Sequence, residues 1–189
     1  LDFNIDNNVI STNIQGFTLV ADWALRYFKK QGFGHLVNIS SIAGIRGNGI
    51  APSYNATKAY QINYLEGLRI NVKNHSSSIT ITDVRPGFVN TAMAKGDNLF
   101  WMASVQKAAG QIFEAIKHKR KVVYVTKRWR LIALVLRLIP FSIPSNQIIR
   151  EVIKSSFGIS SKLYLRLVGC LDLKIVYFDT FSPIFSLTL

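Results

Sequence analysis

Cysteine, histidine and charged residues are all scarce in this chain of 189 residues. A single cysteine, Cys170, excludes an intramolecular disulfide and fits a reducing compartment, so we expect a cytoplasmic protein. The three histidines, His35, His75 and His118, are scattered and have no cysteine cluster beside them, so the sequence indicates no metal site. Charged residues make up 17% and hydrophobic residues 49%, which argues against disorder and fits a single α/β domain.

Tyr54 and Lys58 are the first candidates for chemistry. Ala51-Pro52-Ser53 is a helix-start signal, and the stretch from Tyr54 to about Asn71 has no further proline and many good helix formers. The two residues are therefore expected at positions i and i+4 on one helical face, where side chains are neighbours. A nearby ammonium lowers the pKa of a tyrosine, ordinarily about 10. Taken alone, such a pair is more often an exposed part of an amphipathic helix.

Two predicted strands bring further polar groups toward this pair. Leu36 to Ile39 is a short apolar run typical of a buried parallel strand, and it ends in Ser40-Ser41. A second run, Ile79 to Val84, leads into Arg85-Pro86-Gly87, which stops the strand, and then to Thr91. Open α/β sheets bind ligands at the carboxyl ends of their strands, so these groups are expected at one edge. Thr91 also suits an ordinary helix N-cap.

These motifs resemble those of the short-chain dehydrogenase/reductase family. The matching elements are Asn38-Ile39-Ser40-Ser41 with Ala43-Gly44 after it, Tyr54-x-x-x-Lys58, and Pro86-Gly87-x-x-x-Thr91. Thr12-Asn13-Ile14-Gln15-Gly16 resembles the family's helix with a catalytic asparagine, here Asn13, 28 residues before Ser41. The resemblance covers roughly residues 8 to 125 and implies the α/β class, with a Rossmann-like doubly wound parallel sheet.

The resemblance implies an NAD(P)-dependent oxidoreductase that interconverts an alcohol and a carbonyl by hydride transfer. Tyr54 would be the general acid/base, and Lys58 would lower its pKa and hydrogen-bond the nicotinamide ribose. Ser41 would hold the substrate oxygen, and Asn13 would hold a water in a proton relay leading to Lys58. The nicotinamide end of the cofactor would lie against Pro86, Gly87 and Thr91. Singly, each residue also has a purely structural interpretation; in combination they favour a catalytic site.

The family's glycine-rich turn, which holds the cofactor pyrophosphate, has no counterpart in the sequence. Gly32-Phe33-Gly34 precedes a predicted strand instead of following one, and the glycines between Gly44 and Gly49 lie between Ser41 and Tyr54. We interpret the sequence as a fragment without the amino-terminal strands of the sheet and without the phosphate-binding loop. Such a chain is expected to bind NAD or NADP weakly and to turn over little or nothing. The alternative is a non-catalytic remnant or a peripheral membrane-associated binding protein.

Basic residues outnumber acids by 23 to 10, which gives a formal net charge of +13. Eight bases fall within 21 residues that contain no acid: Lys117, Lys119, Arg120, Lys121, Lys127, Arg128, Arg130 and Arg137. The segment Trp129 to Leu138 is apolar, has arginines near its ends and is about half as long as a membrane span. Two interpretations stay open: an interfacial helix on anionic lipid, and a substrate-side cap helix with a solvated basic edge.

The sequence thus divides into three parts. Residues 1–125 form the predicted partial catalytic domain, residues 126–150 the basic cap or interfacial helix, and residues 151–189 an extension of unknown role. Strand-like runs in that extension are Leu163 to Val168 and Leu171 to Phe178. The expected partner is a small-molecule alcohol or carbonyl substrate. A homo-oligomer and a peripheral contact with anionic membrane are left open, and nucleic acid is disfavoured because no recognised motif accompanies the charge.

Overall fold

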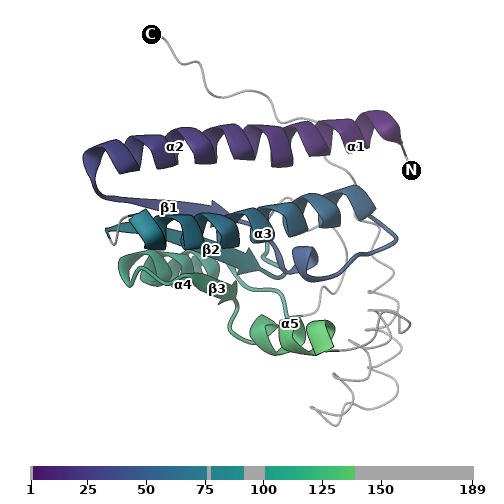
Figure 1. Ribbon diagram of the computed structural model, residues 1–189. Coiled ribbons are helices and arrows are strands. Elements are labelled where there is room, and N and C mark those ends of the chain that lie inside the picture. Colours follow the sequence, from purple (N-terminus) through teal and green to yellow (C-terminus); the bar gives the residue numbers. More distant parts are fainter. Residues whose placement is uncertain (1, 76–77, 92–100, 139–189) are drawn as a thin grey trace, which may run out of the picture.

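The computed structural model describes residues 2–75, 78–91 and 101–138. Its centre is a three-stranded parallel sheet with the order β1-β2-β3 (Figure 1). The strands are β1 (Gly34–Ile39), β2 (Ile79–Pro86) and β3 (Val122–Val125). The pairing of β1 with β2 begins with Gly34 opposite Ile79. The pairing of β2 with β3 ends with Pro86 opposite Val125. The predicted α/β class with a parallel sheet is confirmed, and each predicted strand within the described residues is present.

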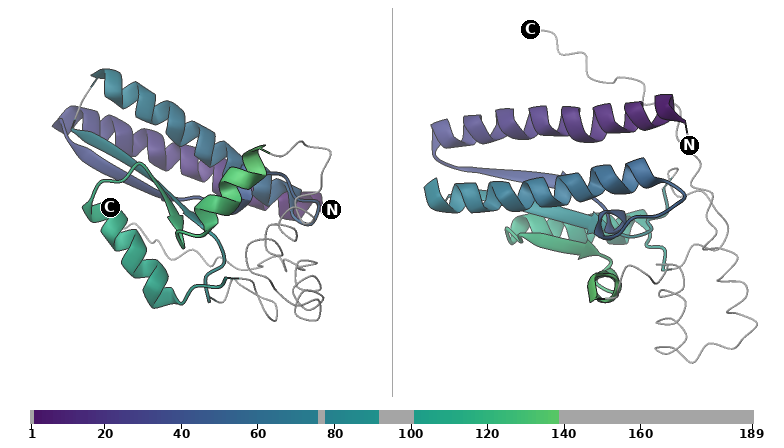
Figure 2. Two further views of the ribbon diagram at one scale, coloured as in Figure 1. Left: turned by 90° about the horizontal axis from the view of Figure 1, so that it is seen from below. Right: turned by 45° about the vertical axis from the view of Figure 1, so that its right-hand side comes forward.

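Helices cover both faces of the sheet (Figures 1 and 2). A long helical segment opens the chain and consists of α1, a π-helical segment and α2, and α3 lies beside it. Helix α4 lies on the opposite face, and α5 follows β3. Their bounds are α1 Phe3–Ile10, the π-helical segment Ser11–Gly16, α2 Phe17–Gln31, α3 Pro52–His75, α4 Val105–Lys117 and α5 Trp129–Leu138.

The helix ends follow local rules that the sequence carries. The Asp2 carboxylate caps α1 by accepting the Asn4 N–H at 2.8 Å, and the Ser104 hydroxyl caps α4 by accepting the Lys107 N–H at 3.2 Å. Helix α2 ends at Gly32, whose φ of 85° is the left-handed conformation that glycine adopts at little cost. The predicted helix from Tyr54 to Asn71 is longer at both ends.

The two faces of the sheet carry separate apolar clusters, as the alternation of side chains along a strand requires. On one face, Ile81 of β2 packs with Leu25 of α2 and Leu65 of α3. On the other face, Val84 of β2 packs with Ala108 of α4. The first face also buries charged and polar groups, and these lie beneath α3, where the candidate site is built.

Helix α5 packs beyond the carboxyl ends of the strands through Trp129, Ile132 and Leu136. Their neighbours include Ile42, which lies just after β1, and Phe88, which lies just after β2. None of the described helices has the length and apolar character needed to cross a membrane. The expected interfacial or cap segment, residues 126–150, is described only as far as residue 138, and the strand-like runs predicted after residue 160 lie outside the described residues.

Candidate active site

Ser41 and Tyr54 meet at the carboxyl end of β1. Ser41 directly follows Ser40, at the end of the strand, and caps a short 3₁₀ turn, η2 (Ile42–Ile45), by accepting the Ala43 N–H at 3.1 Å. The Ser41 hydroxyl is also hydrogen-bonded to the Tyr54 hydroxyl. Tyr54 stands in the first turn of α3, so the strand end and the helix start place two hydroxyl groups together.

The Tyr54 side chain is half-buried, and its ionisation follows from that. Burial raises the pKa of Tyr54, and the hydrogen bond with Ser41 lowers it without cancelling the effect of burial. The sequence predicts a lowered pKa through Lys58, and this expectation is not met. The Lys58 ammonium lies 5.8 Å from the centre of the Tyr54 ring, and its described hydrogen bonds are directed to other groups.

Lys58 lies one turn after Tyr54 and is held by two acceptors. Its Nζ donates to the Ile39 carbonyl at 3.1 Å and to the Gln61 Oε1 at 3.2 Å. Burial lowers the pKa of Lys58 to about 8, and the negative charge of Asp83 opposes this shift. A lysine with this pKa exchanges its proton readily near neutral pH.

Asn13 lies in the π-helical segment between α1 and α2, which alters its backbone hydrogen bonding. The Phe17 N–H donates to the Ile14 carbonyl, whereas in a regular α-helix it would donate to the Asn13 carbonyl. The Asn13 carbonyl instead accepts the Gln61 Nε2 at 2.8 Å. The Asn13 side chain donates to the Thr57 hydroxyl at 3.1 Å, which fixes it against α3.

Gln61 is the residue that sequence reasoning missed. Gln61 is 3% exposed and links Asn13 to Lys58. Its Nε2 donates to the Asn13 carbonyl, and its Oε1 accepts from Lys58 and, at 3.4 Å, from Asn38. The reverse amide orientation would set the NH₂ group against two donors and the oxygen against a carbonyl. The position of Gln61 three residues after Lys58 is the one signal in the sequence that could have drawn attention to it.

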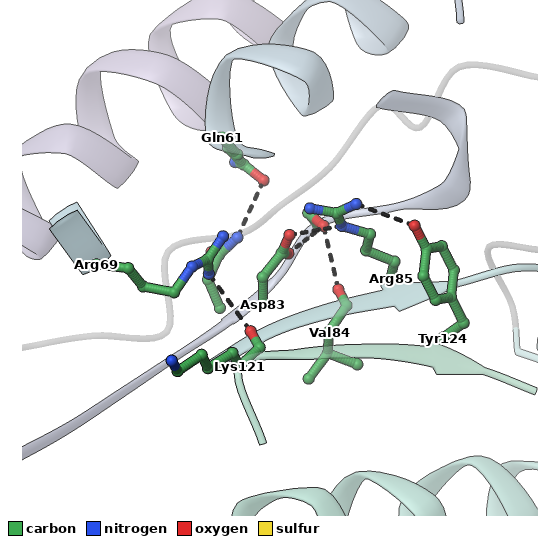
Figure 3. Close-up of polar contacts among 9 residues, drawn as sticks. Gln61, Arg69, Asp83, Val84, Arg85, Lys121 and Tyr124 are labelled. Atoms are coloured by element: carbon green, nitrogen blue, oxygen red, sulfur yellow. Dashed lines mark hydrogen bonds and ion pairs between the residues drawn. The ribbon is translucent and has the colours of Figure 1, made fainter. Parts of the chain in front are cut away.

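A second missed group is the buried carboxylate of Asp83 in β2. Asp83 is 0% exposed and accepts the Ser40 hydroxyl at 2.5 Å and the Arg85 Nε at 2.6 Å. Arg85 also donates to the Tyr124 hydroxyl at 3.0 Å, and Figure 3 shows Asp83, Arg85 and Tyr124 linked across β2 and β3. Burial would lower the pKa of Arg85, but the contacts with Asp83 and Tyr124 outweigh it and raise the pKa. The sequence signal for this group was a charged residue, Asp83, inside the predicted strand from Ile79 to Val84.

Gly44 permits the turn after Ser41 to lie directly on α3. A Cβ at this position would fall 2.6 Å from the Lys58 backbone carbon and 2.8 Å from the Ala59 nitrogen. Contacts that short do not occur, so any larger residue would push the turn away from the helix. The spacing of Ser41 from Tyr54 and Lys58 therefore depends on this glycine.

Gly87 and Thr91, which are expected at the nicotinamide end, make contacts within the described part of the chain. Pro86 ends β2, and the Gly87 N–H donates to the Val125 carbonyl at 2.7 Å. A Cβ at Gly87 would fall 2.1 Å from the Trp129 indole, so the space above this glycine is taken by α5. Thr91 is exposed, and its hydroxyl donates to the Val89 carbonyl at 3.4 Å. Residues 92–100 lie outside the described part of the chain.

Comparisons with known proteins agree with this architecture. A short chain dehydrogenase from Burkholderia cenocepacia, solved in complex with NADP, has a TM-score of 0.64 at 19% identity and covers 84% of this chain. Among curated proteins, an uncharacterized oxidoreductase of Myxococcus xanthus is 31% identical over 90 residues. A 3-oxoacyl-[acyl-carrier-protein] reductase of Chlamydia muridarum is 38% identical over 95 residues.

These matches cover only part of each relative. The chain spans 35% of the length of the Myxococcus protein, 38% of the Chlamydia reductase and 61% of the Burkholderia structure. The sequence profile of the short chain dehydrogenase family matches residues 3–100, which is more than half of the chain and includes the segments that carry Asn13, Ser41, Tyr54 and Lys58. The chain therefore belongs to the short-chain dehydrogenase family.

Proposed function

We propose that this chain carries the proton-transfer part of a nicotinamide-dependent oxidoreductase that interconverts a carbonyl and an alcohol. The observation that carries the proposal is the meeting of the Ser41 and Tyr54 hydroxyls at the carboxyl end of β1, with the Lys58 ammonium one helical turn away. Membership of the short-chain dehydrogenase family supports hydride chemistry at this site.

Tyr54 acts as the proton donor when a carbonyl is reduced. Its raised pKa keeps the phenol protonated near neutral pH, so the proton that carbonyl reduction requires is present on Tyr54. The Ser41 hydroxyl donates a hydrogen bond to the substrate oxygen and holds it next to the phenol. As the carbonyl carbon accepts hydride, its oxygen takes the Tyr54 proton, and a tyrosinate remains.

Lys58 stabilises and reprotonates that tyrosinate. Its pKa of about 8 is close enough to neutrality for the ammonium to give up a proton and regain one from solvent. Gln61 acts as a positioning group, since its Oε1 accepts from the Lys58 ammonium while its Nε2 is anchored on the Asn13 carbonyl. An amide exchanges protons poorly, so in this proposal Gln61 orients Lys58 and occupies the Asn13 carbonyl. The sequence-based expectation was that Asn13 would hold a water in a proton relay leading to Lys58.

The donors of the site fit a nicotinamide ribose at one end. Lys58 has three N–H groups, of which two have acceptors within the described residues, so the third can bind a ribose hydroxyl beside Tyr54. When bound, such a cofactor supplies the hydride. Gly87 does not offer open space, because the Trp129 indole lies against it. Pro86 and Thr91 remain proposed contacts of the nicotinamide end.

The proposal is tested with the chain alone and with a fusion. Alone, the chain should bind NADH and NADPH more weakly than micromolar in calorimetry and give no turnover with a panel of ketones and aldehydes. Fused behind the amino-terminal nucleotide-binding segment of the Chlamydia muridarum reductase, it should oxidise NADPH in the presence of a carbonyl. Micromolar binding together with turnover by the chain alone would overturn the fragment interpretation.

A non-catalytic remnant is the competing function, and the low coverage of the curated relatives supports considering it. The same fusion separates the two. A fusion that folds and binds NADPH but reduces no member of the panel would favour the remnant and count against the proposed chemistry.

A further inference from the structure

The outward side of α5 carries leucines instead of polar residues. Leu131, Leu134 and Leu138 are 50%, 54% and 74% exposed. At about 100° per residue they fall within about 60° of one another, directly opposite the buried stripe that contains Ile132 and Leu136. One helix of ten residues therefore presents apolar side chains on two opposite sides, and only one of these sides is covered by the described fold.

Basic side chains border these leucines. Lys127, Arg130 and Arg137 are exposed, and none of them forms an ion pair with any residue in the described ranges. We call the six residues Lys127, Arg130, Leu131, Leu134, Arg137 and Leu138 the α5 outer face. No acid occurs between Lys117 and Arg137, so nothing in that stretch neutralises the positive charge of the face.

The helix is fixed in this orientation, so the leucines cannot turn inward. Trp129 and Leu136 pack with Ile42, Phe88 and other apolar groups near the strand ends. The Arg46 guanidinium also donates to the Leu136 carbonyl at 3.4 Å. Figure 2 shows α5 at the periphery of the fold, beyond the end of β3. The α5 outer face is thus a preformed surface.

We propose that the α5 outer face docks on a membrane surface that contains anionic lipids. Its leucines would enter the boundary between headgroups and acyl chains, while Lys127, Arg130 and Arg137 would contact lipid phosphates. A nucleic acid would satisfy the bases but leave the central leucines in water, so the observations favour lipid. A helix of ten residues is about 15 Å long, so it lies along the surface and does not span the bilayer.

Docking in this way brings the candidate site close to the bilayer. The inner side of α5 packs on Ile42 and Ile45, in the turn that Ser41 caps. The helix is therefore both a cover for the substrate side and a membrane contact, and the two interpretations left open by the sequence are compatible. The inference does not depend on catalysis, because the surface exists whether or not the site turns over.

The test is co-flotation of the full chain with lipid vesicles. The chain should float with phosphatidylcholine vesicles that contain phosphatidylglycerol, and it should stay at the bottom of the gradient with pure phosphatidylcholine. Changing Leu131, Leu134 and Leu138 together to Ser should weaken binding about tenfold or more. The pair Arg130→Gln and Arg137→Gln should weaken it about thirtyfold, and high salt should weaken wild-type binding.

A matched control is the pair Leu19→Ser and Val20→Ser on α2, whose side chains are 71% and 58% exposed. This variant should float like wild type, and circular dichroism should give the same helix content for all variants. The proposal is overturned if wild type does not float, or if the α5 outer-face variants float like the control. Retention of the chain on duplex DNA but not on vesicles would overturn it in favour of nucleic acid. Loss of stability in the leucine variant, without flotation of wild type, would show that the chain covers this face itself.

Discussion

Replacing Lys58 with Met should make the free energy of unfolding depend on pH differently from that of wild type. Burial lowers the pKa of Lys58 to about 8 from an ordinary 10.5. Between these values the unfolded chain binds more protons than the folded chain, so wild-type stability rises with pH. Below pH 8 the cost of burying the cation is fully present, and above 10.5 it is gone.

The size of this effect follows from the two pKa values. Each unit of difference corresponds to about 1.4 kcal/mol, so wild type should gain about 2.5 kcal/mol relative to Lys58→Met between about pH 7 and pH 10. The variant also loses some stability at every pH, because the Ile39 carbonyl and Gln61 no longer receive a hydrogen bond from residue 58. That loss is constant and does not alter the slope.

The assay is urea unfolding of both proteins at several pH values, followed by tryptophan fluorescence. Subtracting the two curves cancels the titration of all groups that the proteins share. Lys29→Met, on the exposed side of α2, controls for the loss of one surface cation. A difference between wild type and Lys58→Met that stays constant across this range, or that changes with the opposite sign, would refute the buried-cation reasoning.

Substitutions at Gly44, Gln61 and Asp83 have defined outcomes. Gly44→Ala should lower the free energy of unfolding in urea by about 1–3 kcal/mol, because its Cβ would overlap the backbone at Lys58. Gly47→Ala is the control and should change the stability little, because nothing lies within 4 Å of the added Cβ. Equal effects of the two substitutions would contradict the overlap at Gly44. Gln61→Leu should lower the pKa of Lys58 by about one further unit, and Gln61→Glu should raise it. Both changes are measured by NMR of the lysine ammonium. An unchanged pKa in both variants would contradict the role of Gln61 in positioning Lys58. Asp83→Asn should destabilise the fold by about 3–5 kcal/mol, since it leaves a buried guanidinium unpaired, and a cost below about 1 kcal/mol would argue against that ion pair.

The elements that hold Tyr54, Lys58 and Ser41 could be predicted because their signals are local. Proline before Tyr54 starts a helix, i and i+4 spacing puts two side chains on one face, and a short apolar run ending in serines marks a strand end. The structure has all three of these features. Each of these signals depends only on residues a few positions apart in the sequence.

The remaining features depend on contacts between distant segments. Gln61 matters because it reaches the carbonyl of a residue 48 positions earlier, which a single sequence does not reveal. The direction of the Tyr54 pKa shift was predicted wrongly, because burial raises this pKa and the hydrogen bond with Ser41 offsets burial only in part. Gly87 was interpreted only as a cofactor contact, although the Trp129 indole is its neighbour in the fold.

The most direct test of the central claim is the rate of NADPH oxidation by the fusion protein with Tyr54 intact and with Tyr54→Phe. The phenylalanine variant keeps the ring and its packing but has no proton to give. We expect turnover to fall about 100-fold or more while calorimetry gives unchanged NADPH binding. Turnover that is the same in both proteins would contradict the assignment of Tyr54 as the proton donor, and with it the proposed site.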